Sequence, residues 1–295
     1  MRADVVSGVG ELRAVIVGCA RDCAAHLPAA LENARRIGSL FREASYIVVE
    51  NDSVDGTKAI LQRWRAATSN VTLVCLDGLA RTAQRTLRLA VARNEYLRVL
   101  RRSALAQREL LIVLDLDDIN AAPADLERVA EACALLAASP ELTGVFANQR
   151  GTYFDMWALR HPERCPGDVW EEVFDAALAT GGGDDRLAFE RTFGARVFEL
   201  EEHAAPLDVT SAFGGLGVYK VDRVVAHASP YSGFKRKLVS LGGEERSVGW
   251  QVCEHVSFNA SLVHAGGALR VLPWLINADT TGLTFPPSAF RSLAF

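Results

Sequence analysis

The sequence predicts an α/β protein with a mainly parallel sheet flanked by helices, and three observations support this class. Short apolar segments alternate with longer segments in which apolar residues recur at helical spacing. One apolar segment, LLIVL at 110–114, is uninterrupted, which is typical of a strand covered on both faces. The 295-residue chain is 49% hydrophobic and 23% charged, enough apolar material for a substantial core. Repeated strand–helix–strand units favour crossover connections and therefore parallel strands.

The alternation is clearest in the first half of the chain. We expect strands and helices there in turn, the strands at 14–19, 46–49, 71–76, 110–114 and 144–148 and the helices at about 26–41, 54–67, 89–105 and 123–138. The second half is less regular, with a glycine-interrupted strand at 211–219, a Gly- and charge-rich loop at 229–247, a helix at 252–263 and a strand at 269–273. No linker is evident. We therefore predict one domain over 1–295, with a regular half (about 1–150) and a more variable half (about 151–295).

Charge and cysteine content narrow the class of protein. The formal net charge of −4 provides no basic field for nucleic acid. The N-terminus lacks the layout of a signal peptide, and no apolar run approaches the ~20 residues of a membrane span. The six cysteines form no Cys-x-x-Cys pair, which disfavours a zinc site, and several lie in apolar segments, which indicates reduced, mostly buried thiols. We expect a cytoplasmic protein whose contact with the inner face of a membrane is at most peripheral.

Three carboxylates, Asp115, Asp117 and Asp118, follow the uninterrupted apolar run directly. Ligands of open parallel sheets bind beyond the carboxyl ends of the strands, and alternation along a strand places Asp115 and Asp117 on one side. Two like charges held close raise each other's pKa unless a cation lies between them. The pattern therefore predicts a site for Mn²⁺ or Mg²⁺. The alternatives are a strand end followed by a solvated acidic turn, or Asp118 as the cap of the helix that starts near Pro123.

Three other classes of α/β protein do not fit this sequence. A dinucleotide site requires a glycine fingerprint after the first strand, and the chain there reads Ala20-Arg21-Asp22. A phosphate loop of the type Gly-x-x-x-x-Gly-Lys-Ser/Thr is absent. In phosphatases with an aspartyl nucleophile the Asp-x-Asp pair follows the first strand, whereas here it follows the fourth.

Several motifs occur together in one order: ENDSVDGT at 50–57, Arg93-Asn94, Asp115-Leu116-Asp117 and DMWALR at 155–160. In this order the chain resembles glycosyltransferases of the GT-A fold, which is Rossmann-like. The segment 155–160 is similar to one in fungal capsule-associated α-1,3-mannosyltransferases. The resemblance covers about residues 14–160. It implies transfer of a sugar from a UDP- or GDP-linked donor to a hydroxyl of a glycan, lipid-linked or small-molecule acceptor, as in polysaccharide biosynthesis. The first half would bind the nucleotide-sugar and the second half the acceptor.

The resemblance also implies residue roles. A metal held by Asp117, with Asp115 directly or through the ribose, would neutralise the charge that develops on the leaving diphosphate. Imidazole suits manganese, and His255 is favoured over His264 as a further ligand because Glu254 adjoins it. The alternative for either histidine is a hydrogen-bonded helix residue.

Glu254 is the candidate catalytic carboxylate near the acceptor. It would act as the base if the reaction inverts the anomeric centre, or position the sugar if the reaction retains it. The nucleotide-sugar is expected to contact Ala20, Arg21, Glu50, Asn51, Asp52, Arg93, Asp115, Gly214 and Gly215. Asn51 and Asp52 also suit a strand-to-helix turn, Arg93 suits pairing with an aspartate, and the glycines suit a bulge.

Two further functions stay open. A sugar nucleotidyltransferase would carry a Gly-rich basic loop after the first strand, which residues 20–23 do not offer. A non-catalytic glycan- or nucleotide-binding relative would bind without turnover, although the intact Asp115 and Asp117 favour catalysis.

Overall fold

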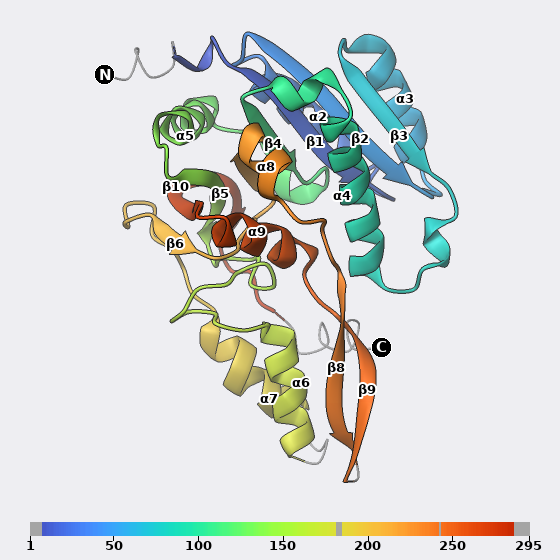
Figure 1. The fold of residues 1–295 in the computed structure, drawn as a ribbon, viewed down its shortest axis with the longest axis vertical. Coiled ribbons are helices and arrows are strands. Elements are labelled where there is room, and N and C mark those ends of the chain that lie inside the picture. The colour runs from blue at the N-terminus through green and yellow to red at the C-terminus, as the bar shows by residue number, and fades with distance from the viewer. Residues whose placement is uncertain (1–7, 181–184, 242, 286–295) are drawn as a thin grey trace.

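The computed structural model describes residues 8–180, 185–241 and 243–285. An eight-stranded sheet runs through its centre in the order β3-β2-β1-β4-β7-β5-β10-β6 (Figure 1). The strands are β1 (Arg13–Ala20), β2 (Glu43–Asn51), β3 (Val71–Leu76), β4 (Leu110–Leu114), β5 (Leu142–Gly151), β6 (Leu207–Val209), β7 (Leu216–Lys220) and β10 (Ala268–Thr280). Strands β1 to β4 are parallel, and β5 pairs parallel with β10, whereas β7 runs antiparallel between β4 and β5 and β6 runs antiparallel at the edge. The predicted mainly parallel sheet is confirmed.

Helices cover both faces of the sheet, which explains the uninterrupted apolar run of β4. Leu111 and Val113 belong to one buried cluster, and the alternate residues of the strand belong to the other. The first cluster packs under α4 (Arg85–Arg101), α8 (Val221–His227) and α9 (Glu254–His264). The second packs under α2 (Leu27–Gly38), α3 (Thr57–Ala67) and α5 (Leu126–Ala138).

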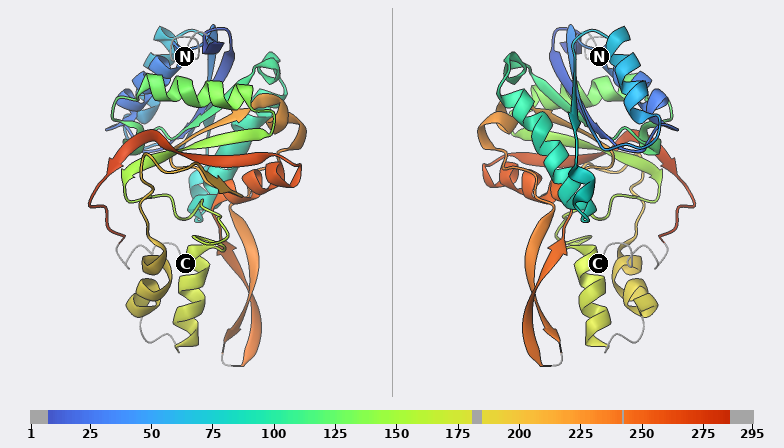
Figure 2. Two further views of the ribbon diagram at one scale, coloured as in Figure 1. Left: turned by 90° about the vertical axis from the view of Figure 1, so that its left-hand side faces the viewer. Right: turned by 90° about the vertical axis from the view of Figure 1, so that its right-hand side faces the viewer.

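A hairpin, β8 (Phe234–Leu241) and β9 (Glu244–Gln251), projects from the body beside α6 (Val169–Ala179) and α7 (Asp185–Phe189) (Figures 1 and 2). The expected loop at 229–247 was therefore wrong. The inward side of the hairpin includes Lys237, whose Nζ lies 2.7 Å from Glu171 Oε1 on α6. Val239 and Trp250 are buried on it. The alternation of apolar and polar residues expected of a strand is obscured because a lysine, which buries its aliphatic stem, occupies an inward position.

Some predicted boundaries also shift for local reasons. The strand expected at 211–219 begins only at Leu216, because Gly214 and Gly215 have φ of +70° and +84°, outside the β region. The strand expected at 269–273 continues past Pro273 to Thr280, and its pairing with β5 shifts register between Val271 and Ile276. Proline cannot donate to a ladder, so it occupies the irregular part.

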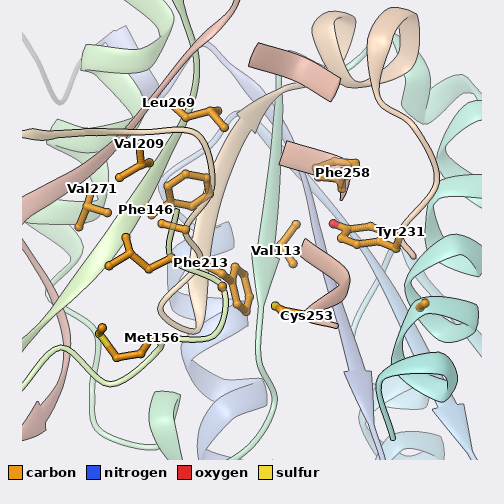
Figure 3. Close-up of a cluster of buried hydrophobic side chains, with 14 of the residues drawn as sticks. Val113, Phe146, Met156, Val209, Phe213, Tyr231, Cys253, Phe258, Leu269 and Val271 are labelled. Atoms are coloured by element: carbon orange, nitrogen blue, oxygen red, sulfur yellow. The ribbon is translucent and has the colours of Figure 1, made fainter. Parts of the chain in front are cut away.

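The order of the strands creates a crevice. From β1 the chain adds β2 and β3 on one side and then places β4 on the other side of β1. At such a switch point the connections leave the sheet in opposite directions, and a gap opens beyond the carboxyl ends. Figure 3 shows part of the buried apolar cluster, where Val113 lies near Phe213 and Cys253, two residues that also line the cavity described below.

In the described part of the chain, no helix combines the length and the apolar composition needed to cross a membrane. All six cysteines are free thiols.

Candidate functional site

A cavity of about 1010 Å³ opens at the switch point between β1 and β4. This volume lies at the upper end of the range for small-molecule sites, roughly 300–1000 Å³. Its wall comes from the ends of β1, β2 and β4, the starts of α4 and α9, and the segments 154–157 and 278–283. Of the predicted site residues it brings together Ala20, Arg21, Asn51, Arg93, Asp115, Asp117, Glu254 and His255.

The acidic loop lies on one side of this cavity, with Asp115, Asp117 and Asp118 in its wall. Burial, followed by the charges of Asp115 and Asp118, raises the pKa of Asp117 to about 6. A carboxylate destabilised in this way is stabilised by a cation. Asp118 does not cap the following helix, because Asp125 does so by accepting hydrogen bonds from the amides of Glu127 and Arg128. The capping alternative was therefore wrong, whereas the solvated acidic turn stays open.

The donor chemistry of the loop fits a hard divalent cation. Asp117 presents carboxylate oxygens beside two further carboxylates, and Mg²⁺ and related ions are commonly held by one or two carboxylates together with substrate phosphates. Across residues 8–180, 185–241 and 243–285, no three His, Cys, Asp or Glu side chains converge on a ready-made metal site. The loop therefore fits a metal that shares its coordination with a bound substrate.

His255 lies in the wall as a neutral imidazole. Its ring is 2% exposed and stacks on Phe213, with the ring centroids 3.9 Å apart. Burial, and then the charge of Arg93, lowers its pKa well below the ordinary value. Neither ring nitrogen has a hydrogen-bond partner in the described structure, so the alternative of a hydrogen-bonded helix residue does not hold. A neutral imidazole with free nitrogens is the form that binds a metal, and this role stays a prediction.

Arg93 joins the acidic loop to α9. Its side chain, 4% exposed, donates from Nε to Glu254 Oε1 at 2.9 Å and from Nη2 to Asp115 Oδ1 at 3.0 Å. The guanidinium group also lies over the ring of Phe213, 5.1 Å from its centroid. Of the roles considered for Arg93, pairing with an aspartate is the one observed. Glu254 lines the cavity with one oxygen engaged by this guanidinium.

Two predicted residues serve the turns that support the wall. Asp52 has φ of +47° and accepts hydrogen bonds from the amides of Gly78 and Ala80 at 2.7 and 2.6 Å, which ties down the connection between β3 and α4. Glu50 is fully buried and accepts from the amide of Ser53 at 2.8 Å. Neither residue belongs to the cavity lining.

Gly214 and Gly215 support the wall through their backbone. Asn120 Nδ2 donates to the carbonyls of Asp115 at 3.0 Å and Gly215 at 2.9 Å, and Asn277 Nδ2 donates to that of Gly214 at 2.8 Å. A Cβ on Gly215 would lie 2.8 Å from Ile119 Cγ2. The glycines thus let this turn pack against the acidic loop, although they do not line the cavity themselves.

The cavity also contains residues that were not among the predicted contacts. Asp155 accepts hydrogen bonds from the amides of Gly214 and Ala158, and burial raises its pKa to about 6. Arg85 and Arg88, at the start of α4, also line the cavity. Their signal in the sequence is the arginine-rich segment 81–88.

Comparison with protein-family models finds no match, and comparison with curated proteins finds none either. Among solved structures, the chain is similar to the mannosyltransferase PcManGT from Pyrobaculum calidifontis in complex with GDP-Man and Mn²⁺ (15% identity, 91% of this chain and 57% of that one, TM-score 0.49). It is similar to TarS from S. aureus (12% identity, 89% and 58%, TM-score 0.45). A third is glucosyl-3-phosphoglycerate synthase from Mycobacterium tuberculosis in complex with Mn²⁺, UDP and phosphoglyceric acid (13% identity, 99% and 78%, TM-score 0.46).

The chain spans under three fifths of the length of the first two of these structures, 57% and 58%. At identities of 12–15%, what each of them binds is a property of that protein. The chemistry of this chain has to come from its own residues.

Proposed function

We propose that the protein is a metal-dependent glycosyltransferase of the GT-A type that moves a sugar from a nucleoside-diphosphate donor to a hydroxyl acceptor. The observation that carries the proposal is the position of Asp115 and Asp117. They leave the carboxyl end of β4 at the switch point of the sheet and enter a cavity large enough for a nucleotide-sugar. The half up to about residue 150 would bind the donor, and the half from about 151 would complete the acceptor side.

In this reaction the bond between the anomeric carbon and the diphosphate breaks, and negative charge develops on the leaving phosphate. When bound, Mn²⁺ or Mg²⁺ would neutralise that charge. Asp117 would hold the ion, with Asp115 directly or through the ribose and with His255 as a candidate further ligand. Arg93 fixes the orientation of Asp115 through its 3.0 Å hydrogen bond.

The acceptor hydroxyl must lose a proton as it attacks. Glu254 remains our candidate for the group that receives this proton or, in a retaining reaction, positions the sugar. Arg93 holds one of its oxygens, and the residue lines the same cavity as the acidic loop. The guanidinium group of Arg93 contacts both Glu254 and Asp115 and would thereby link the acceptor and donor sides of the cavity.

The donor side also offers a hydrogen-bond donor for the base or ribose. Asn51 is 6% exposed and lines the cavity, and its Nδ2 has no hydrogen-bond partner within the described residues. A buried amide of this kind is satisfied when a ligand supplies an acceptor. UDP and GDP are both candidate carriers, with a glycan, lipid-linked or small-molecule acceptor. The six free thiols support a cytoplasmic location.

The test is thermal unfolding of the protein against a panel of nucleoside diphosphates, with and without Mn²⁺. A ligand that binds only the folded state adds about 2.7 kcal/mol of stability at a hundredfold excess over its Kd. We expect a manganese-dependent rise in Tm with one nucleotide, and its loss in Asp117→Asn. The absence of a rise with every nucleotide would contradict the proposal. A rise without sugar transfer from the matching donor would favour the non-catalytic binding relative.

A further inference from the structure

One wall of the cavity is basic. Arg21 follows β1, and Arg85 and Arg88 lie in the first turn of α4, yet all three line the cavity that contains the acidic loop. The charges of these guanidinium groups interact: the pKa of Arg88 is lowered first by burial and then by the charges of Arg21 and Arg85. Like charges gathered in this way destabilise one another unless an anion lies among them.

The protein itself uses little of this positive charge. Arg85 is exposed and makes no side-chain hydrogen bond or ion pair within residues 8–180, 185–241 and 243–285. Arg88 Nη1 donates to two neutral acceptors, the carbonyls of Thr82 at 2.6 Å and Ala83 at 2.8 Å. In the described part of the chain, Arg21 forms an ion pair with the neighbouring Asp22, with Nε 3.4 Å from Oδ2, and its charge contributes, after hydrogen bonds from backbone amides, to lowering the pKa of Asp52.

Two residues that line this cavity have a buried polar atom without a hydrogen-bond partner. Arg21 Nη1 is buried and has no hydrogen-bond partner in the described structure, and the same holds for Nδ2 of Asn51, a residue that is 6% exposed. Buried donors without acceptors cost free energy, typically about 1–3 kcal/mol each, and a ligand that brings acceptors removes this cost. The fold leaves these donors without acceptors, and a ligand could supply them.

The start of α4 adds to the positive potential. The helix has 17 residues, no acidic residue in its first turn, and no side-chain cap from Gln84. Its amino end carries the positive pole of the helix dipole, which favours a nearby anion. The helix pole and the guanidinium groups thus favour the same ligand charge.

We infer that Arg21, Arg85 and Arg88 form an anion subsite that takes a phosphate group of the substrate. Guanidinium groups match phosphate in geometry as well as in charge. The subsite lies in the same cavity as Asp115, Asp117 and Asp118. A phosphate bound here would share that cavity with a cation held by Asp117.

Two sources of this phosphate are chemically equivalent, and both rest on the proposed function. One is the diphosphate of the donor, and the other is a phosphate on the acceptor. Binding of a free anion to the three arginines does not depend on that function.

The experiment is calorimetric titration of the metal-free protein with pyrophosphate, a nucleoside diphosphate, the parent nucleoside and a sugar phosphate. The test variant is Arg85→Gln, at an exposed position where the fold does not depend on the side chain. Arg81→Gln is the matched control, because Arg81 is exposed in the same segment and does not line the cavity. It removes the same net charge from the protein.

We expect Arg85→Gln to weaken pyrophosphate binding roughly tenfold, the lower end for a hydrogen bond to a charged group, while Arg81→Gln changes it less than about twofold. A parallel loss for the nucleoside diphosphate, with no loss for the nucleoside, would assign the subsite to the donor. A loss for the sugar phosphate with unchanged nucleoside diphosphate binding would assign it to the acceptor.

Equal binding of all phosphates by the two variants would overturn the subsite. Arg21→Gln provides a second test, because it removes a different member of the cluster and is expected to give the same pattern. Failure of the glycosyltransferase proposal looks different: pyrophosphate would bind and depend on Arg85, while no nucleoside diphosphate would stabilise the protein with Mn²⁺.

Discussion

Replacement of Arg93 by methionine tests how the acidic loop and α9 are held together. The side chains of Arg93 and Glu254 are 4% and 5% exposed, and the third partner, Asp115, is 27% exposed. Removing one member of a buried ion pair leaves an uncompensated charge, which typically costs about 3–5 kcal/mol. We expect Arg93→Met to lower the free energy of unfolding by about this amount, because methionine keeps the apolar volume but removes the charge.

The assay is urea denaturation of four proteins: wild type, Arg93→Met, Glu254→Gln and the double variant. In the double variant the glutamine no longer needs a cation, so the second substitution should restore part of the loss, with a coupling energy above about 1 kcal/mol. The control is Arg35→Met on α2, which breaks the ion pair with Glu32 between two side chains that are each more than half exposed. Exposed pairs contribute little. A loss for Arg93→Met as small as that of Arg35→Met, or full additivity in the double variant, would refute the reasoning.

Three further predictions concern the acidic loop. Without metal, Asp117→Asn should stabilise the protein at neutral pH, because a folded-state pKa of about 6 against 3.8 makes ionised Asp117 a cost of roughly 3 kcal/mol. This gain should vanish as the pH falls below about 4, where wild-type Asp117 is protonated in both states, and unfolding curves from pH 4 to 7.5 measure it; a gain independent of pH would contradict it. Gly215→Ala should destabilise more than Gly266→Ala, since both have positive φ but only the first Cβ meets a neighbour, at 2.8 Å; equal losses in thermal melts would show that the close packing is unimportant. Asn120→Ala should cost about 1–3 kcal/mol and weaken manganese-dependent nucleotide binding, because the carbonyl of Asp115 loses the Asn120 donor and that of Gly215 keeps the amide of Asp115 but loses the side-chain donor; intact binding would separate the asparagine from the site.

Sequence patterns located two strands with their full bounds. The apolar run at 110–114 coincides with β4, because a strand covered on both sides needs apolar residues at every position. The run at 71–76 coincides with β3, an edge strand whose residues are half-buried or exposed. The carboxylates after β4 line the cavity at the carboxyl end of that strand, and their role as metal ligands stays a prediction.

The order of the second half of the sheet lay beyond the reach of these patterns. Strand β7 enters between β4 and β5 and runs antiparallel to both, a choice made by packing between distant segments. Local composition carries no signal for it. The hairpin β8–β9 escaped for a different reason, because Lys237 replaces an apolar residue on its inward side.

The site residues show the same limit, because their roles depend on contacts between distant segments. Asp52 was a reasonable candidate for ribose, but its carboxylate accepts hydrogen bonds from the amides of Gly78 and Ala80, which follow the next strand of the chain and are brought to it by the fold. The arginines at 85 and 88 carried little signal, because an arginine in a helix is usually solvated. Only the fold brings them to the cavity that also holds Asp117.

The most direct test of the central claim is turnover. The protein is incubated with Mn²⁺ and a panel of UDP- and GDP-linked sugars, and release of the nucleoside diphosphate is measured by mass spectrometry, first with water and then with sugar acceptors. We predict release from one donor, dependent on metal and abolished in Asp117→Asn while that variant stays folded. Release that persists in Asp117→Asn, or no release from any donor that binds, would contradict a glycosyltransferase centred on the acidic loop.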